Sequence, residues 1–277
     1  MGRPPTSTPR LVAPSRPAPA PAPGRRAPVV GGEARRRRFG AALRVDRRRV
    51  KTAVWTLAHP ATGRTVTLLG TMHIGDPAYF GQLSEVLAGL AEAGAEVHVE
   101  GISDGVAGPM SDWERDRLAE ADGWANAETS GAAVALLQLE SQGGKLRLPA
   151  GTRNIDLTYV ELLRRVGWDD YRRLLAPQPE LRVAPGLGPV VRAAMRFQLR
   201  HSRSLARLAS LRPWARRVSE VVMGARNEIA YAGGLDALER GDVVLVWGTD
   251  HLPELAERFA AAGYRPRREQ WFDACTI

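Results

Sequence analysis

The sequence predicts an α/β fold with a mainly parallel central sheet flanked by helices. The first observation is a motif that occurs twice. The apolar runs 66–69 and 243–247 each end in Gly-Thr-x-His, and a proline suited to the first turn of a helix follows soon after each copy. The second observation is that strand-like and helix-like patterns alternate from about residue 50 onward. This alternation is typical of parallel sheets.

Apolar periodicity and turn residues place the individual elements. Residues 54–57 and 65–69 predict two strands joined by a turn at 61–63, and Pro77 opens an amphipathic helix that Gly94 ends. The remaining expected elements are a strand at 96–100, a helical region at 111–142 broken near Gly123, a short strand at 154–156, helical stretches from 158 to about 232, a strand at 243–247, a helix at 254–262 and a strand at 267–272.

Composition divides the chain into a tail and a domain. Residues 1–48 are rich in proline, alanine and arginine and cannot bury enough apolar surface to fold, so we expect a disordered tail there. Residues 49–277 form the predicted α/β domain, with a helical insertion or cap at about 110–235. Fourteen basic and two acidic residues lie in 1–51, so most of the net charge of +9 belongs to the tail. The charge is therefore a weak argument for nucleic-acid binding, and no specific nucleic-acid partner is predicted.

Several classes of protein are excluded by what the sequence lacks. Its only cysteine is Cys275, which rules out an intramolecular disulfide and a cysteine-rich zinc site. No apolar run approaches the roughly 18 residues of a membrane-spanning helix, and no secretory signal is visible. We therefore expect a cytoplasmic protein. Serine-hydrolase, zincin, P-loop and dinucleotide-binding motifs are also missing.

An arginine-rich segment lies within the expected domain. From Leu181 to Ser219 there are nine arginines and no acidic residue. Arginines recur there at helical spacing beside an apolar stripe of Val191, Met195 and Leu199. A solvated helix face is one interpretation; weak contact with an anionic membrane surface, which would make the protein peripheral to a membrane, is the other.

Two histidines and one glutamate are the main candidates for chemistry. His73 and His251 end the two Gly-Thr-x-His motifs, and Glu100 ends the strand predicted at 96–100. The carboxyl ends of parallel strands share one edge of a sheet, where ligands bind, so we expect these three side chains to converge. Two histidines and a carboxylate suit a divalent metal, and the same groups can also act as a general base and its partner without metal.

Other residues are expected to support this site. Gly70, Thr71, Gly248 and Thr249 belong to the two motifs, and their glycines would allow close approach to a ligand. Arg226 and Asn227 lie in a predicted helix, where a buried arginine needs a carboxylate or an anionic ligand. Asp250 adjoins His251, while Asp156 is a candidate for either function or helix capping. His98 lies on the same strand face as Glu100, either as a supporting residue or as a core histidine, and no role is expected for His59 and His201.

These motifs, in this order over about residues 52–273, resemble the TraB/PrgY/GumN family, which includes the TIKI proteases and is grouped with erythromycin esterase and ChaN-like proteins. The resemblance implies active-site roles for His73, Glu100 and His251 and matches Arg226 and Asn227 to the Glu-Arg-Asn motif of the family. The sequence departs from the family at Ala225, where the family has glutamate, and at Gly101, where it has a larger apolar residue, and it does not show the C-terminal membrane helices of some relatives.

The resemblance implies a site without fixing one reaction. TIKI-like members are metal-dependent peptidases, erythromycin esterases need no metal, and ChaN-like members bind haem. The first expectation is a hydrolase that acts on a peptide or small signal molecule, with Mn, Co or Zn on His73, Glu100 and His251 and with Arg226 stabilising an oxyanion. A metal-independent esterase and a non-catalytic peptide- or haem-binding protein are the alternatives. The sequence leaves the oligomeric state open.

Overall fold

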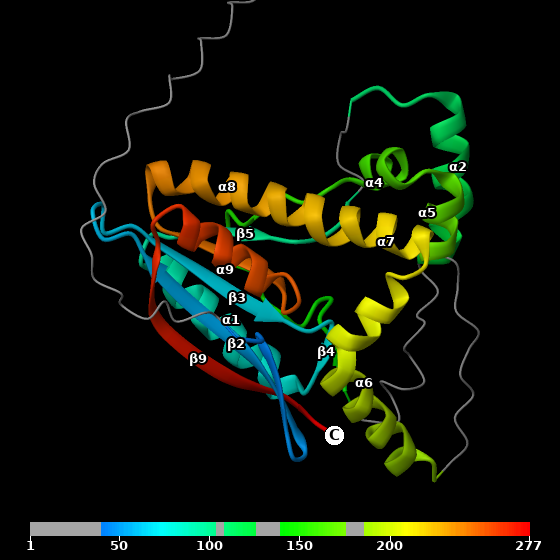
Figure 1. Ribbon diagram of the computed structural model, residues 1–277. Helices are drawn as coiled ribbons and strands as arrows, with labels where there is room; N and C mark the ends of the chain where they lie inside the picture. The colour runs from blue at the N-terminus through cyan, green and yellow to red at the C-terminus, as the bar shows by residue number, and fades with distance from the viewer. Residues whose placement is uncertain (1–39, 104–107, 126–138, 176–185) are drawn as a thin grey trace, which may run out of the picture. The chain divides into compact units, whose positions relative to one another are not determined.

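The computed structural model describes residues 40–103, 108–125, 139–175 and 186–277. These residues form an α/β domain with a mixed, mostly parallel central sheet flanked by helices (Figure 1). The predicted fold class is confirmed. The disorder expected for the tail falls mostly on residues 1–39, which lie outside the described residues. The described helices include none that is both long and apolar enough to cross a membrane.

The centre of the sheet is parallel. Strand β8 pairs in parallel with β3 on one side and with β5 on the other, and β5 pairs in parallel with β7. The far side is antiparallel, because β2 pairs with β1, β3 and β9. The strands of the sheet are β1 (Leu43–Asp46), β2 (Arg49–Ala58), β3 (Thr65–Thr71), β5 (Glu96–Val99), β7 (Arg153–Asn154), β8 (Val243–Gly248) and β9 (Arg265–Thr276). A small second sheet pairs β4 (Ile74–Gly75) with β6 (Glu140–Ser141).

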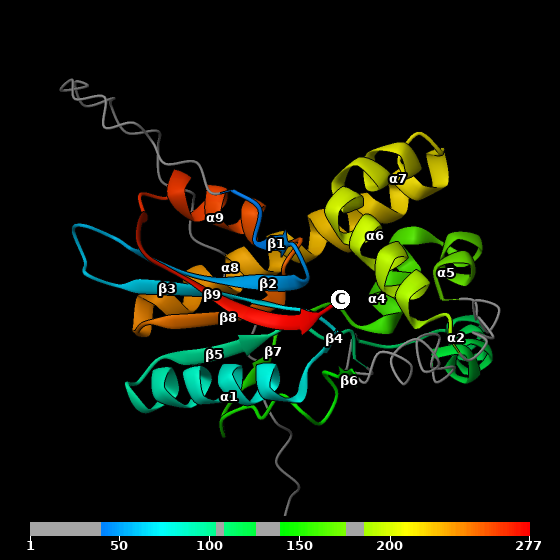
Figure 2. The same cartoon turned by 90° about the horizontal axis from the view of Figure 1, so that it is seen from below.

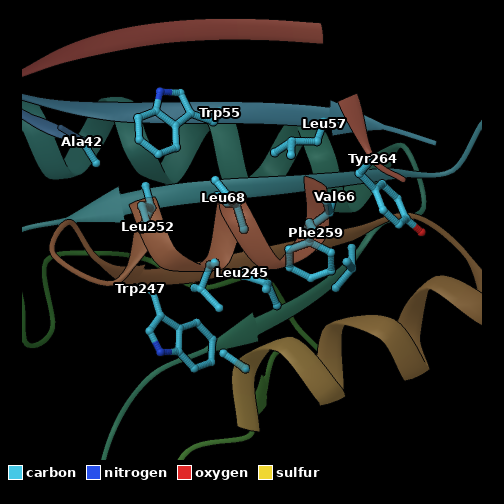
Figure 3. Packing of buried hydrophobic residues seen from close by; sticks show 14 of the residues in the cluster. Ala42, Trp55, Leu57, Val66, Leu68, Leu245, Trp247, Leu252, Phe259 and Tyr264 are labelled. Atoms are coloured by element: carbon cyan, nitrogen blue, oxygen red, sulfur yellow. The ribbon is translucent and has the colours of Figure 1, made fainter. Parts of the chain in front are cut away.

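Helices cover both faces of the sheet. In Figure 2, α1 (Pro77–Glu92) lies below the sheet and α9 (Leu252–Ala261) lies above it. Successive side chains of strand β8 point to opposite faces of the sheet, so this strand contributes to the hydrophobic core on each face. Leu245 and Trp247 pack with α9 and with α8 (Arg226–Arg240), as Figure 3 shows, whereas Val246 packs with α1 on the opposite face. Burial on both faces explains why this strand is a continuous apolar run.

The remaining helices include a second, smaller cluster (Figure 1). Four helices, α2 (Asp112–Ala125), α4 (Tyr159–Val166), α5 (Trp168–Leu175) and α7 (Pro213–Ser219), contribute to it around Leu162 and Tyr171. The π-helix η1 (Glu220–Ala225) joins α7 to α8, and α6 (Gly188–Ala209) precedes α7. The helical insertion expected at 110–235 is therefore not one separate unit, because parts of this range belong to the central sheet and its core. β7 belongs to the central sheet, and Ala230 of α8 lies in the core on the face of that sheet covered by α9.

Several element boundaries differ from the expectation. The first strand begins at Leu43 and Ala42 is buried, so ordered structure starts before residue 49 because β2 needs a partner along its first residues. The predicted helix 111–142 runs through Gly123 to Ala125 without a break there. Residues 140–141, near the expected end of this helix, instead form strand β6, which pairs with β4. Residues 126–138 lie outside the described part of the chain.

Candidate functional site

The candidate site lies where the parallel strands end. Glu100 directly follows β5, and Gly248 is the last residue of the neighbouring β8. The Gly248 amide donates a 2.7 Å hydrogen bond to Oε1 of Glu100. A Cβ atom on Gly248 would lie 3.1 Å from the same oxygen, so any side chain at this position would push the carboxylate away. The close approach that this glycine permits is therefore to a carboxylate of the protein itself.

Glu100 has the environment of an acid–base group. Its side chain is only 7 % exposed. Burial raises its pKa to about 7, because water no longer solvates the carboxylate. The charge of Arg226 and the Gly248 hydrogen bond act in the opposite direction, and the charge of Asp156 adds to the increase. A carboxyl group with a pKa near neutrality can both accept and release a proton under ordinary conditions.

Arg226 lies between two buried carboxylates. Its Nη2 atom is 2.5 Å from Oδ2 of Asp156 and 3.3 Å from Oε2 of Glu100, and its Nε atom also donates to Asp156. Burial of the guanidinium is therefore compensated by paired charges, as a buried arginine requires. The Nη1 atom has no hydrogen-bond partner among the described residues. Nε and Nη2 are already engaged by carboxylates, so a ligand of this guanidinium would have to bind at Nη1.

Asp156 holds this arginine and does not cap the following helix. The N-cap of α4 is Thr158, which forms a capping box with Glu161. The capping role considered for Asp156 is thus wrong. Its fully buried carboxylate accepts hydrogen bonds from the amides of Gly101 and Leu157 and from Arg226. These bonds fix the carboxylate against the end of β5, next to Glu100.

A π-helical turn delivers Arg226 and Asn227 to the site. The six residues of η1 immediately precede Arg226, the first residue of α8. A π-helical turn shifts the rotation of the residues after it, and such turns are frequent at functional sites. Arg226 faces the carboxylates while Asn227, fully buried, faces His251.

His251 is held by a chain of hydrogen bonds. Its Nδ1 atom lies 2.7 Å from Oδ1 of Asn227, and Nδ2 of Asn227 donates to Oε2 of Glu254 at 2.7 Å. A carboxylate only accepts, so Glu254 fixes the orientation of the Asn227 amide. The amide oxygen then faces His251, which must carry its proton on Nδ1. Its Nε2 atom therefore has a free lone pair.

That lone pair lies close to Glu100. Nε2 of His251 is 3.8 Å from Oε2 of Glu100, which is too long for a hydrogen bond but close enough for a single water or hydroxyl to contact both. His251 is 5 % exposed, and burial, with Arg226 as the second cause, lowers its pKa to about 4. Near neutral pH the pair therefore consists of a neutral histidine and a glutamate that titrates.

His73 belongs to the same edge but is bound differently. It lies between β3 and β4, its side chain is exposed, and its backbone carbonyl accepts from the amide of Gln142. Despite this exposure, partial enclosure by protein atoms and then the charge of Arg226 lower its pKa. The charge of His73 is the smallest of the causes that shift the pKa of His251, and it acts to lower it. In the described part of the chain, no hydrogen bond joins His73 to Glu100 or His251.

Three other residues of the two motifs, Gly70, Thr71 and Thr249, are enclosed by protein. A Cβ atom on Gly70 would lie 2.8 Å from the carbonyl oxygen of Ala53, so this glycine permits packing against β2, and the close approach is to protein instead of a ligand. Thr71 and Thr249 are buried, and the Thr249 amide donates to the Thr71 carbonyl. Asp250 is exposed beside His251.

The three remaining histidines lie apart from this cluster. His98 is buried and contacts Glu96 at 3.3 Å, which favours the core interpretation. His59 packs edge-on against Tyr264, and His201 lies against Phe197.

In the described part of the chain, the side chains at this edge are not arranged as ligands around one metal ion. A zinc-like ion needs ligand atoms about 2.0–2.2 Å away. Oε2 of Glu100, the oxygen near His251, already faces the positive charge of Arg226, and Oε1 is bonded to Gly248. Among the described residues, no three histidine, cysteine, aspartate or glutamate side chains are grouped to hold a metal. The Mn, Co or Zn ion on His73, Glu100 and His251 stays a prediction.

Glu254 is the site residue that sequence reasoning missed. It lies three residues after His251 in the first turn of α9, where an acidic residue is ordinary, because it interacts favourably with the helix dipole. The available signal was the spacing: residues three apart on a helix lie on one face, so Glu254 was placed to support His251.

Comparison with known proteins adds no relative. No protein-family model matches the chain, and no curated protein or solved structure matches it. The resemblance to the TraB/PrgY/GumN family therefore rests on the motifs, and the geometry of the site has to carry the functional argument.

Proposed function

We propose that this protein is a hydrolase that cleaves an ester or amide bond in a peptide or small molecule by acid–base catalysis. The observation that carries the proposal is the buried Glu100, with a pKa of about 7, whose Oε2 lies 3.8 Å from the unprotonated Nε2 of His251. A proton donor and acceptor of this pKa is suited to work at neutral pH and contributes about 10²–10⁴-fold in rate.

Each group has a distinct role in the proposed reaction. A water between Glu100 and His251 gives one proton to the Glu100 carboxylate as its oxygen attacks the carbonyl carbon, while Nε2 of His251 accepts a hydrogen bond that orients it. The Nη1 atom of Arg226 donates to the oxyanion that forms. Protonated Glu100 then gives its proton to the leaving alcohol or amine, and the bond breaks. Water is consumed, and Glu100 returns to its starting state.

His73 is proposed to contact the substrate. It is exposed at the same edge, and it affects the protonation of His251. An exposed imidazole can bind a polar substrate group without moving the buried pair. The motif resemblance, which places His73, Glu100 and His251 in one active site, supports this assignment.

A hydrolysis screen tests the proposal. Purified protein is assayed with a panel of chromogenic esters and a peptide library, with and without EDTA, and its metal content is measured. We expect turnover that survives EDTA and falls about 10²-fold or more in Glu100→Gln, with Asp250→Asn as an exposed control that keeps activity. Activity lost with EDTA and restored by Mn, Co or Zn would support the metal-dependent peptidase instead. No turnover together with a haem absorbance band would favour the binding protein.

A further inference from the structure

Helix α6 carries two separate apolar stripes. The inward stripe, Val191, Met195 and Leu199, packs on a core cluster that contains Val50 and Ile277. This is the stripe that the sequence suggested for a membrane surface, and the structure uses it to attach α6 to the domain. Any external partner must bind a different face of the helix.

The second stripe points outward. Val190, Phe197, Leu205 and Leu208 recur at spacings of seven, eight and three residues, which places them on one side of a helix. Their exposed fractions are 62 %, 61 %, 39 % and 63 %. Of the nine large apolar side chains exposed in the described part of the chain, six lie between Leu187 and Leu211. This concentration distinguishes the outward face of α6 from scattered surface residues.

Arginines border the outward stripe. Arg192, Arg196 and Arg200 lie at four-residue spacing on the side of the helix between the two stripes, and Arg200 is exposed near Phe197. Neither Arg196 nor Arg200 has an ion-pair partner among the described residues. This contrasts with Arg217 on α7, which pairs with Asp170 at 2.6 Å.

We propose that the outward face of α6 binds the anionic surface of a membrane. An exposed apolar stripe bordered by unpaired arginines is the pattern of a helix that lies in the plane of a bilayer interface. The partner must carry negative charge, because Arg196 and Arg200 border the stripe without an ion-pair partner in the described residues and α6 contains no acidic residue. Anionic lipid headgroups supply that charge next to an apolar layer. The inference is independent of the proposed hydrolysis.

Vesicle binding by the full chain tests this proposal. Wild type should sediment with vesicles of phosphatidylcholine and phosphatidylserine, and much less with phosphatidylcholine alone. Val190→Ser/Phe197→Ser should weaken binding about tenfold or more, because two apolar side chains no longer insert. The matched control Met110→Ser/Trp113→Ser, which removes two exposed apolar side chains from the region of α2, should bind like wild type.

A charge pair sharpens the same measurement. Arg196→Gln/Arg200→Gln should weaken binding about 25-fold, since each basic residue near an anionic surface contributes roughly 1 kcal/mol, or about fivefold. Arg165→Gln/Arg172→Gln removes the same charge from exposed positions on α4 and α5 and should have little effect. The basic residues of the tail are present in every variant, so the differences report on α6 alone.

A fluorescent label measures insertion directly. Cys275 is the only cysteine and is 1 % exposed, so a thiol-reactive, environment-sensitive dye on Phe197→Cys labels one site. Its emission should shift to shorter wavelength with anionic vesicles, and the same dye on Trp113→Cys should not shift. Unchanged binding in both α6 double variants would overturn the proposal. A wild-type dimer that Val190→Ser/Phe197→Ser dissociates would also overturn it, by assigning this face to a second copy of the chain.

Discussion

The two Gly-Thr-x-His motifs have nearly the same sequence and opposite environments. Both follow neighbouring parallel strands, whose last residues, Thr71 and Gly248, are paired in register. After the first motif the chain enters the short strand β4, and His73 is exposed. After the second motif it turns directly into α9, and His251 is buried with its ring hydrogen-bonded to Asn227. The motif therefore determines where a histidine lies on the sheet, while the segment that follows determines its environment.

The glycines differ in the same way. Gly70 permits contact with the backbone of Ala53, a purely structural role, whereas Gly248 permits contact with Glu100, a candidate catalytic group. A motif repeated in a sequence thus does not imply two equivalent halves of an active site. The difference between the two copies can be tested at each position.

The largest expected effect separates the two histidines. His251→Ala should lower kcat/KM about 10²-fold, because it removes the group that orients the attacking water. His73→Ala should act mainly through KM, since an exposed residue that binds substrate lies outside the proton transfer. Steady-state kinetics on the best substrate from the screen measure both values. Equal losses of kcat would contradict the distinction and support the symmetric roles that the sequence suggested.

The second effect concerns pH and stability. Glu100 has its pKa raised from 4.5 to about 7, so its contribution to stability is full below pH 4.5 and is lost as pH rises through 7. His251 has its pKa lowered from 6.5 to about 4, so its contribution is present above pH 6.5 and is lost as pH falls through 4. Between pH 4.5 and 6.5 the two contributions change the free energy of unfolding in opposite directions as pH rises. Over this range, folding in effect moves one proton from the histidine to the glutamate.

Single substitutions should reveal how each group makes the free energy of unfolding depend on pH. In His251→Gln, the free energy of unfolding should fall relative to wild type as pH rises from 4.5 to 7, by on the order of 3 kcal/mol. In Glu100→Gln it should rise with pH by a similar amount between 4 and 6.5. Urea unfolding at several pH values gives both curves, and Asp250→Asn, at an exposed position beside His251, is the control. Parallel curves for the two variants would show that the buried pair does not titrate in this way.

The third effect compares the two glycines. Gly70→Ala should destabilise the fold by about 1–3 kcal/mol, because the new Cβ meets a backbone oxygen that cannot move away. Gly248→Ala should cost less stability, since the Glu100 side chain can shift, but it should reduce activity by displacing that carboxylate. Thermal unfolding and activity are measured on both variants. Loss of stability without loss of activity in Gly248→Ala would argue against Glu100 as the catalytic group.

The smallest expected effect tests the hydrogen bond between His251 and Asn227. Asn227→Leu leaves the buried Nδ1–H of His251 without a partner and should cost at least about 1 kcal/mol of stability. Activity should fall as well, because the histidine is no longer held in the tautomer with Nε2 unprotonated. A changed pH profile for kcat, with Asp250→Asn unaffected, distinguishes this positioning role from simple destabilisation.

The sequence by itself determined the fold class, the parallel strands β3, β5 and β8, and the position of Glu100 and His251 at their carboxyl ends. These follow from local patterns, because strand-length apolar runs, prolines and glycines act over a few residues. It also identified Arg226, Asn227 and Asp156 as candidates. It was wrong about the capping role of Asp156, about the end of the helical region expected at 111–142, where residues 140–141 form β6, and about which apolar face of α6 remains exposed.

Only the tertiary structure decided how these residues meet. The exposure of His73 and the burial of His251 depend on whether β4 or α9 follows, and on α8 packing over the second copy. The chain from Glu254 through Asn227 to His251, and the arginine shared by Asp156 and Glu100, join residues up to 126 positions apart. Charge, burial and tautomer are properties of that assembled neighbourhood, because desolvation depends on every segment that excludes water, and no local pattern in the sequence records it.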